Sequence, residues 1–270
     1  MHCAAKEKHR RVYKWIEDLS PEERAELAKS RIRKVADQID ALLHLHESNR
    51  ILIYTDTVTS KIPRSHAANT YNLISDCLFG YQLVRLCALW DDPSRKDRAS
   101  LPVVAELIRN KNVRRILACE RYSWHSRRGA RILNPSHEVE VYTQQLSATE
   151  AYGQRLGRRN ARSTIRSMLR CIKSSDEIQL SEELIALKGF RNDHVAHCLQ
   201  YDKATVNARP EAKFGHEEQL LEKTLELVRL FALDLAGTNY SWEEYRQQHK
   251  RCASELWQSI EFSIGNPPKV

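Results

Sequence analysis

Glycine and proline are scarce in this chain, since its 270 residues contain only eight of each. Residues that break helices are therefore few, whereas Leu, Ala, Arg, Glu, Lys and Gln, which favour helix, are abundant. No stretch approaches the roughly 20 apolar residues that a membrane-spanning helix needs. The basic N-terminus is not followed by the apolar run of a secretory signal. We therefore expect a helical, cytoplasmic protein with no membrane partner.

Close cysteine pairs are also lacking. The seven cysteines are scattered, and none shows the C-x2-C spacing of a zinc site or a redox centre. We expect reduced thiols, no metal and no cofactor. Acidic residues are outnumbered, because 43 Lys and Arg stand against 35 Asp and Glu, for a formal net charge of +8. This balance favours a polyanionic partner without identifying it.

Helix signals recur along the whole chain. Ser20 followed by Pro-Glu-Glu predicts a helix start, and apolar residues at steps of three and four continue to about Glu47. The β-leaning stretch "ILIYTDTVTSKIP" is expected to extend this helix or to form a linker, because a lone strand leaves its edges unpaired. Further helices are predicted over about 67–90, 100–119, 136–173, 216–235 and 241–260, with capping-box spacing at Ser174 and Glu177 and another helix starting at Ser181.

These signals predict one all-α domain over residues 1–270. Its core is expected over about 20–235, with an elaboration at 121–147 and a C-terminal helix at 241–260. No internal repeat and no low-complexity linker divides the chain.

A basic stripe is predicted on the helix that ends near Lys173. Its members step by three or four residues, and they are Arg155, Arg159, Arg162, Arg166, Arg170 and Lys173, with Arg158 beside them. No acid interrupts them, so repulsion weakens the helix by about a few tenths of a kcal/mol per pair. A phosphate backbone would compensate for this repulsion. An ordinary solvated face, or acids on a neighbouring helix, are the alternatives that stay open.

The segment "RNDHVAH", Arg191 to His197, places an arginine, an aspartate and two histidines between two apolar runs. Six residues of α-helix advance about 9 Å and turn about 240°. Arg191 and His197 would thus leave one helix about 120° apart, which does not focus them on one small group. Two copies related by a two-fold axis would form a cleft lined by both pairs, and two-fold dimers are the commonest oligomers. The spacing alone is weak evidence, because an arginine with a histidine close behind also occurs by chance in "RYSWH", where His125 follows Arg121 by four residues.

Arg191, Asn192 and His197 match the R-polar-x4–6-H signature of HEPN domains (higher eukaryotes and prokaryotes nucleotide-binding), which this chain resembles. "YQLVRLCALWDDP", Tyr81 to Pro93, and "LIALKGFRNDHVAH" resemble two elements of the AbiU-like abortive-infection branch. The resemblance implies a HEPN-like antiparallel helical bundle with extra helices. It further implies a homodimer through the motif helices, RNA as the partner, and cleavage without metal.

The residues suit the chemistry that this resemblance implies. His197 would accept the proton of a ribose 2′-hydroxyl as that oxygen attacks the adjacent phosphate. Arg191 would stabilise the charge of the phosphorane transition state, and Asn192 would orient a phosphate or hold the arginine. A second His197 across the dimer would protonate the leaving oxygen. With an RNA substrate, Arg155, Arg159, Arg162, Arg166 and Arg170 become candidate RNA-binding residues.

Two further residues are candidate supports of this site. His194 would supplement His197 or lie on the surface, and we favour the surface. Arg85 would tune the motif together with Asp91 and Asp92, although a structural ion pair is the favoured interpretation. A zinc site at His194, His197 and Cys198 is disfavoured, since adjacent ligands on a helix converge poorly on one ion.

The leading hypothesis is a metal-independent endoribonuclease that acts as a toxin or phage-defence effector, with an antitoxin protein as a further partner. One alternative is a HEPN-like module that binds RNA or a nucleotide without cleaving it. Another is a helical scaffold whose charges serve a protein partner. Cleavage and salt-dependent binding of RNA separate the three.

Overall fold

The computed structural model describes residues 13–63, 66–129, 139–196 and 210–263, with the backbone alone for 125–129, 139–149 and 194–196. The described chain is helical and contains no strand, so the predicted all-α fold is confirmed. No helix in these ranges is long and apolar enough to cross a membrane. The elements are α1 Lys14–Glu17, α2 Pro21–Tyr54, η1 Thr59–Lys61, α3 His66–Ala88, α4 Leu101–Ile108, α5 Lys111–Gly129, α6 Val139–Gln179, α7 Glu182–Phe190, η2 Arg191–Ala196, α9 His216–Ala236 and α10 Trp242–Ser259.

Helix α2 begins where the sequence predicts. The Ser20 hydroxyl accepts a hydrogen bond from the Glu23 amide at 3.2 Å, and the Glu23 carboxylate accepts one from the Ser20 amide at 2.8 Å. This capping box, with Pro21 at the first helical position, satisfies amides that no helical carbonyl reaches. The helix continues to Tyr54, past the predicted end at Glu47, so the β-leaning stretch first extends it and then turns into η1.

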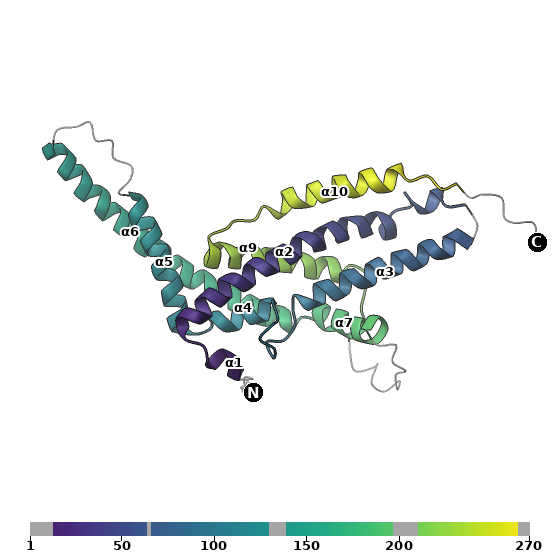
Figure 1. Ribbon diagram of the computed structural model, residues 1–270, viewed down its shortest axis with the longest axis horizontal. Coiled ribbons are helices and arrows are strands. Elements are labelled where there is room, and N and C mark those ends of the chain that lie inside the picture. The colour runs from purple at the N-terminus through teal and green to yellow at the C-terminus, as the bar shows by residue number, and fades with distance from the viewer. Residues whose placement is uncertain (1–12, 64–65, 130–138, 197–209, 264–270) are drawn as a thin grey trace, which may run out of the picture.

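The bundle is built around α2, which packs against α3, α4, α5, α9 and α10. In Figure 1, α2, α3, α9 and α10 lie along the long axis of the molecule, and α7 lies beside one end of α3. One apolar face of α2 is fully buried, with Ile32, Val35, Ile39 and Leu43 among its residues. Trp90 and Phe231, also 0% exposed, fill the centre of the same core. Packing of this kind favours the bundle because each buried large side chain contributes about 1.5–3 kcal/mol.

Helices α5 and α6 lie side by side and form an arm that projects from one end of the bundle (Figure 1). Gly157 of α6 lies so close to α5 that an added Cβ would be 2.8 Å from the Tyr122 ring. Part of the segment predicted as an elaboration, 121–147, belongs to this arm, and its residues 130–138 lie outside the described ranges.

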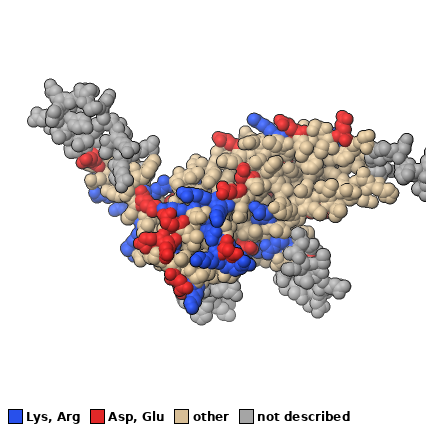
Figure 2. Space-filling view, in the orientation of Figure 1, with Lys and Arg blue, Asp and Glu red and all other residues tan. Residues whose placement is uncertain are grey.

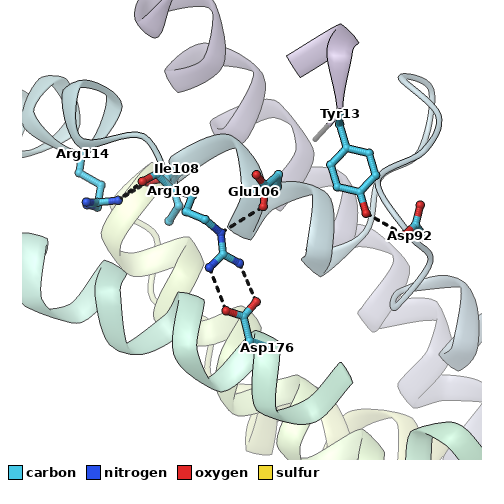
Figure 3. A network of polar contacts seen from close by, with 7 residues as sticks. All are labelled: Tyr13, Asp92, Glu106, Ile108, Arg109, Arg114 and Asp176. Atoms are coloured by element: carbon cyan, nitrogen blue, oxygen red, sulfur yellow. Dashed lines mark hydrogen bonds and ion pairs between the residues drawn. The ribbon is translucent and has the colours of Figure 1, made fainter. Parts of the chain in front are cut away.

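The predicted helix over 100–119 was wrong in one respect, because it is two helices that meet at Arg109 and Asn110. The Arg109 guanidinium donates to both Asp176 carboxylate oxygens, at 2.9 and 2.6 Å, and to Glu106 at 3.1 Å (Figure 3). Arg114 donates to the Ile108 carbonyl at 3.0 Å, which satisfies an acceptor left over at the end of α4. The change of direction is thus held by side chains from three helices.

The helix start predicted at Ser174 was also wrong, since α6 continues unbroken to Gln179. Cys171, Ser175 and Ile178 continue its buried face, and Asp176 faces Arg109. A capping box forms only where the chain enters a helix. Tertiary contacts on both sides of Ser174 keep the chain helical through this position.

Candidate active site

The motif begins at the end of α7. Ser181 caps this helix, because its hydroxyl accepts a hydrogen bond from the Leu184 amide at 3.4 Å, as the sequence predicts. Leu184 and Leu187 are buried against the core and fix the orientation of the helix. From Arg191 to Ala196 the chain widens into a π-helix, which the sequence analysis did not foresee. Single π-helical turns occur often at functional sites, because they change the direction of side chains.

Arg191 is held by two neighbours. Its Nε and Nη2 atoms donate to the Asn192 side-chain oxygen at 3.1 and 2.9 Å. Its Nη1 lies 3.6 Å from a carboxylate oxygen of Asp91, and the two side chains of this pair are 20% and 30% exposed. Asn192 therefore contacts the guanidinium directly, and the roles expected for it in the site stay predictions. The guanidinium carries five N–H donors, so some of them stay available to a ligand.

The end of α3 is anchored, and this positions Asp91. The indole of Trp90 is fully buried and donates to the Thr224 hydroxyl on α9 at 3.0 Å. The Asp91 carbonyl accepts from the Ser100 hydroxyl at 2.7 Å. Asp92 accepts from the Tyr13 hydroxyl at 2.8 Å (Figure 3). Contacts of the residues on both sides of Asp91 thus fix the backbone from which its carboxylate reaches Arg191.

Lys188 is a second cation at this place, and sequence reasoning missed it. Its ammonium donates to the Trp90 carbonyl at 2.7 Å, one helical turn before Arg191. Burial lowers the pKa of Lys188, while nearby Cys87 and Asp91 act in the opposite direction. Burial raises the pKa of the Cys87 thiol to about 11, so this cysteine is no thiolate nucleophile at neutral pH. The sequence signal that could have found Lys188 was its position three residues before Arg191, which puts both side chains near one face of a helix.

A comparison with protein families identifies the family of this chain. The family model HEPN_AbiU2 (AbiU2) matches residues 25–256, which include most of α2, the helices from α3 to α9 and most of α10. The chain belongs to the HEPN AbiU2 family. No curated protein and no solved structure matches it.

In this HEPN AbiU2 protein, His197 lies outside the described residues, as does Cys198. His194 belongs to the π-helix, but its side chain is not described. The 120° separation expected between Arg191 and His197 therefore stays a prediction, as does the disfavoured zinc site. Within the described residues, no group of three or more potential ligands is placed to hold a metal ion.

Arg85 lies on another side of α3. With Tyr81 it lines a cavity of about 280 Å³ whose opposite wall includes His44 and Ser48 of α2. No ion pair or hydrogen bond joins Arg85 to another described residue. At the end of α3, Asp91 lies within ion-pair distance of Arg191.

The basic stripe of the HEPN AbiU2 protein lies on the outer face of α6. Its arginines and Lys173 are exposed, whereas Gly157, Met168, Cys171 and Ser175 are buried on the opposite face. Lys173 pairs with Glu177 at 3.4 Å, but Arg155, Arg159, Arg162 and Arg166 form no ion pair with another described residue. On the face shown in Figure 2, charged side chains gather where the arm joins the bundle, and the opposite end of the bundle is mostly free of them.

Proposed function

We propose that this HEPN AbiU2 protein is a metal-independent endoribonuclease that acts as a homodimer, as a toxin or phage-defence effector. The observation that supports this proposal best is the partly buried Arg191, which Asn192 and Asp91 hold with donors to spare. An arginine fixed before the substrate arrives needs little reorganisation when charge develops on a phosphate. Family membership supports the same role.

In the proposed reaction, His197 accepts the proton of a ribose 2′-hydroxyl, and the 2′-oxygen attacks the adjacent phosphorus. Arg191 stabilises the negative charge on the phosphorane oxygens. The bond to the 5′-oxygen then breaks, and His197 of a second copy donates a proton to this leaving oxygen. The products are a 2′,3′-cyclic phosphate and a free 5′-hydroxyl, so atoms and electrons balance without a further reactant.

A dimer through the motif helices is supported by apolar side chains that face solvent around α7. Ile185, 40% exposed, lies on α7 about one helical turn before Lys188. Leu180, at the turn before α7, is 66% exposed. Exposed apolar groups of this kind favour association, because burying them removes apolar area from water. Two copies facing each other here would bring two motif helices together.

The stripe on α6 would supply sequence-independent affinity. Four of its arginines are exposed and form no ion pair with a described acidic residue, so they can pair with phosphates instead; they are Arg155, Arg159, Arg162 and Arg166. Residues 155–173 extend over about 27 Å of helix, long enough to contact several phosphates. Contacts of this kind position an RNA without selecting its sequence.

The test is cleavage of single-stranded and structured RNA in EDTA by the parent protein, Arg191→Ala and His197→Ala. Loss of cleavage in both variants, with no effect of the chelator on the parent, is the expected result. Arg33→Ala and His66→Ala, which change exposed residues of α2 and α3, are the matched controls and should cleave normally.

Other outcomes point to the rival functions. Binding of RNA by the parent without cleavage contradicts the nuclease and supports the RNA- or nucleotide-binding module. Absence of salt-dependent binding contradicts both and supports the protein-interaction scaffold.

A further inference from the structure

An apolar pocket lies beside the motif helix. It has a volume of about 180 Å³ and opens between α3, α7 and the segment that leads into α9. Its walls include Phe79, Leu83, Leu187, Phe190, Phe214 and Glu217. Phe190 directly precedes Arg191 in the chain. The pocket therefore borders the proposed active site, although no step of the proposed reaction uses it.

The pocket and the cationic site share one ridge of α3. Phe79, Leu83 and Cys87 follow at steps of four residues on α3, and Asp91 lies three residues beyond the last residue of this helix. Phe79 and Leu83 line the pocket, whereas Cys87 and Asp91 adjoin Lys188 and Arg191. Leu83 and Cys87 are four residues apart, or about 6 Å along the helix, and Asp91 lies just beyond the end of that helix. A molecule held at Arg191 could thus reach the pocket with a neighbouring part.

The lining suits a flat aromatic group. Three phenylalanine side chains contribute to it, and Phe214 is 84% exposed, an unusual position for a large apolar side chain. The Tyr54 ring meets the Phe214 ring edge-on, with centroids 6.4 Å apart. Bases stack on aromatic side chains in many proteins that bind single-stranded nucleic acids.

One carboxylate makes the pocket selective. Glu217 is only 3% exposed, and its two oxygens accept hydrogen bonds from the Tyr54 hydroxyl and from the Gly215 amide, the latter at 3.2 Å. Burial, together with the bond to Glu217, raises the pKa of the Tyr54 hydroxyl, which therefore stays a donor. A carboxylate offers about four acceptor positions, so about two remain. They suit a base edge with adjacent N–H donors.

We propose that this pocket binds a nucleobase of the RNA held at Arg191, and that it prefers guanine. The ring N–H and the exocyclic amino group of guanine lie side by side and match the two free acceptor positions of Glu217. Uracil places carbonyl oxygens on both sides of its N–H, and these would face the carboxylate unfavourably. This inference rests on the proposed function for the RNA partner, but not on cleavage.

The test is direct binding of 2′-fluoro tetranucleotides, which lack the attacking hydroxyl, measured by calorimetry with the full chain. One internal position is guanine, uracil or abasic. Stacking contributes about 1–3 kcal/mol per base, so guanine should bind roughly ten- to hundredfold more tightly than the abasic position. Uracil should fall between them.

Two variants connect this preference to the pocket. Ala212→Leu adds volume at a pocket-lining position of the irregular segment before α9, and Phe214→Ala removes the exposed ring. Both should lose the guanine preference. Leu256→Ala, which truncates an exposed leucine of α10 outside the lining, is the matched control and should keep it. Because Phe214 is exposed, its variant tests the pocket even where Ala212→Leu fails to fold.

The remaining outcomes are distinguishable. Equal affinity for the guanine and abasic oligonucleotides, or no binding of either, overturns the pocket, whether or not the protein cleaves RNA. A guanine preference that survives in both pocket variants overturns it as well. Dissociation of a dimer by Ala212→Leu without a change in base preference assigns the pocket to a second copy and overturns the proposal. A preference that depends on the pocket in a protein that cleaves nothing supports the pocket and contradicts the nuclease.

Discussion

Arg191 at the start of the π-helix and Asp91 just beyond α3 are far apart in sequence, yet Nη1 and Oδ1 lie 3.6 Å apart. The same end of α3 receives the Lys188 ammonium through the Trp90 carbonyl. Two cations of the motif helix are therefore held at one anchored helix end. This arrangement gives the carboxylate of Asp91 a positioning role in the proposed site.

Asp91→Asn should lower the cleavage rate roughly tenfold, because a misplaced catalytic group loses part of the advantage of orientation. Global stability should change by less than about 1 kcal/mol, since a partly exposed pair contributes little. Single-turnover kinetics and thermal melting measure the two effects. Asp97→Asn removes an exposed pair with Arg95 and is the matched control. An unchanged rate in Asp91→Asn would show that Asn192 alone positions the arginine.

Replacing Arg159 and Arg166 together by glutamine should weaken RNA binding and its salt dependence. Each phosphate contact on a single strand contributes about 0.7 to the salt slope, so the pair should lower the slope by about 1.4. Binding titrations between 50 mM and 200 mM salt measure this slope, because phosphate contacts change the affinity strongly over that range. Arg33→Gln with Lys34→Gln removes two exposed charges from α2 and should leave the slope unchanged. Equal slopes for the two double variants would contradict a role of the stripe in RNA binding.

Asp234→Asn should stabilise the protein above neutral pH. Burial raises the pKa of Asp234 to about 6, although Ser167, Arg121 and Arg170 act in the opposite direction. A carboxyl whose pKa is raised on folding favours the folded state at low pH, and this contribution is lost as pH rises toward 6. The variant should therefore gain about 1–3 kcal/mol at pH 8 and almost nothing below pH 4. Denaturant unfolding at both pH values, with exposed Asp37→Asn as control, decides the matter.

We predict that the folded protein loses stability in acid because His46 becomes protonated. Burial, together with the charges of Arg246 and Arg50, lowers the pKa of this histidine to about 4. A histidine whose pKa is depressed on folding stabilises the protein above its unfolded pKa of about 6.5, and this stability is lost as pH falls toward 4. The loss should reach about 3 kcal/mol. His46→Gln keeps an acceptor for the Gln82 amide, which lies 3.0 Å from the ring, and should flatten this dependence.

Exposed His66→Gln is the control for His46, and it should retain the parent's pH dependence between pH 6.5 and 4. The measurement is the free energy of unfolding in denaturant at several pH values in this range. A parent profile that is already flat would contradict the assignment of this acid sensitivity to His46.

The positions of most helices could be predicted from the sequence, because their signals are local. Ser20 and Ser181 cap the helices that they were expected to cap, and α3, α9 and α10 begin and end within about two residues of prediction, the usual uncertainty of a helix end. The break at Arg109 and the uninterrupted passage through Ser174 could not be predicted. Both depend on the contact of Arg109 with Asp176, which joins two helices far apart in the chain.

The candidate site divides in the same way. Arg191 and Asn192 were found through a short motif, and Asp91 was noted as a group that could tune it. The ion pair of Arg191 with Asp91, the π-helical turn, Lys188 and the apolar pocket came only from the folded chain.

The sequence by itself determined an all-helical chain, a stripe of like charge on one helix and a motif that places the chain in its family, because periodicity and capping act within a few residues. Tertiary structure alone decided that the end of α3 meets the motif helix. That meeting depends on burial of Trp90 and on its bond to Thr224 of α9, and no local pattern specifies how separate helices share a core.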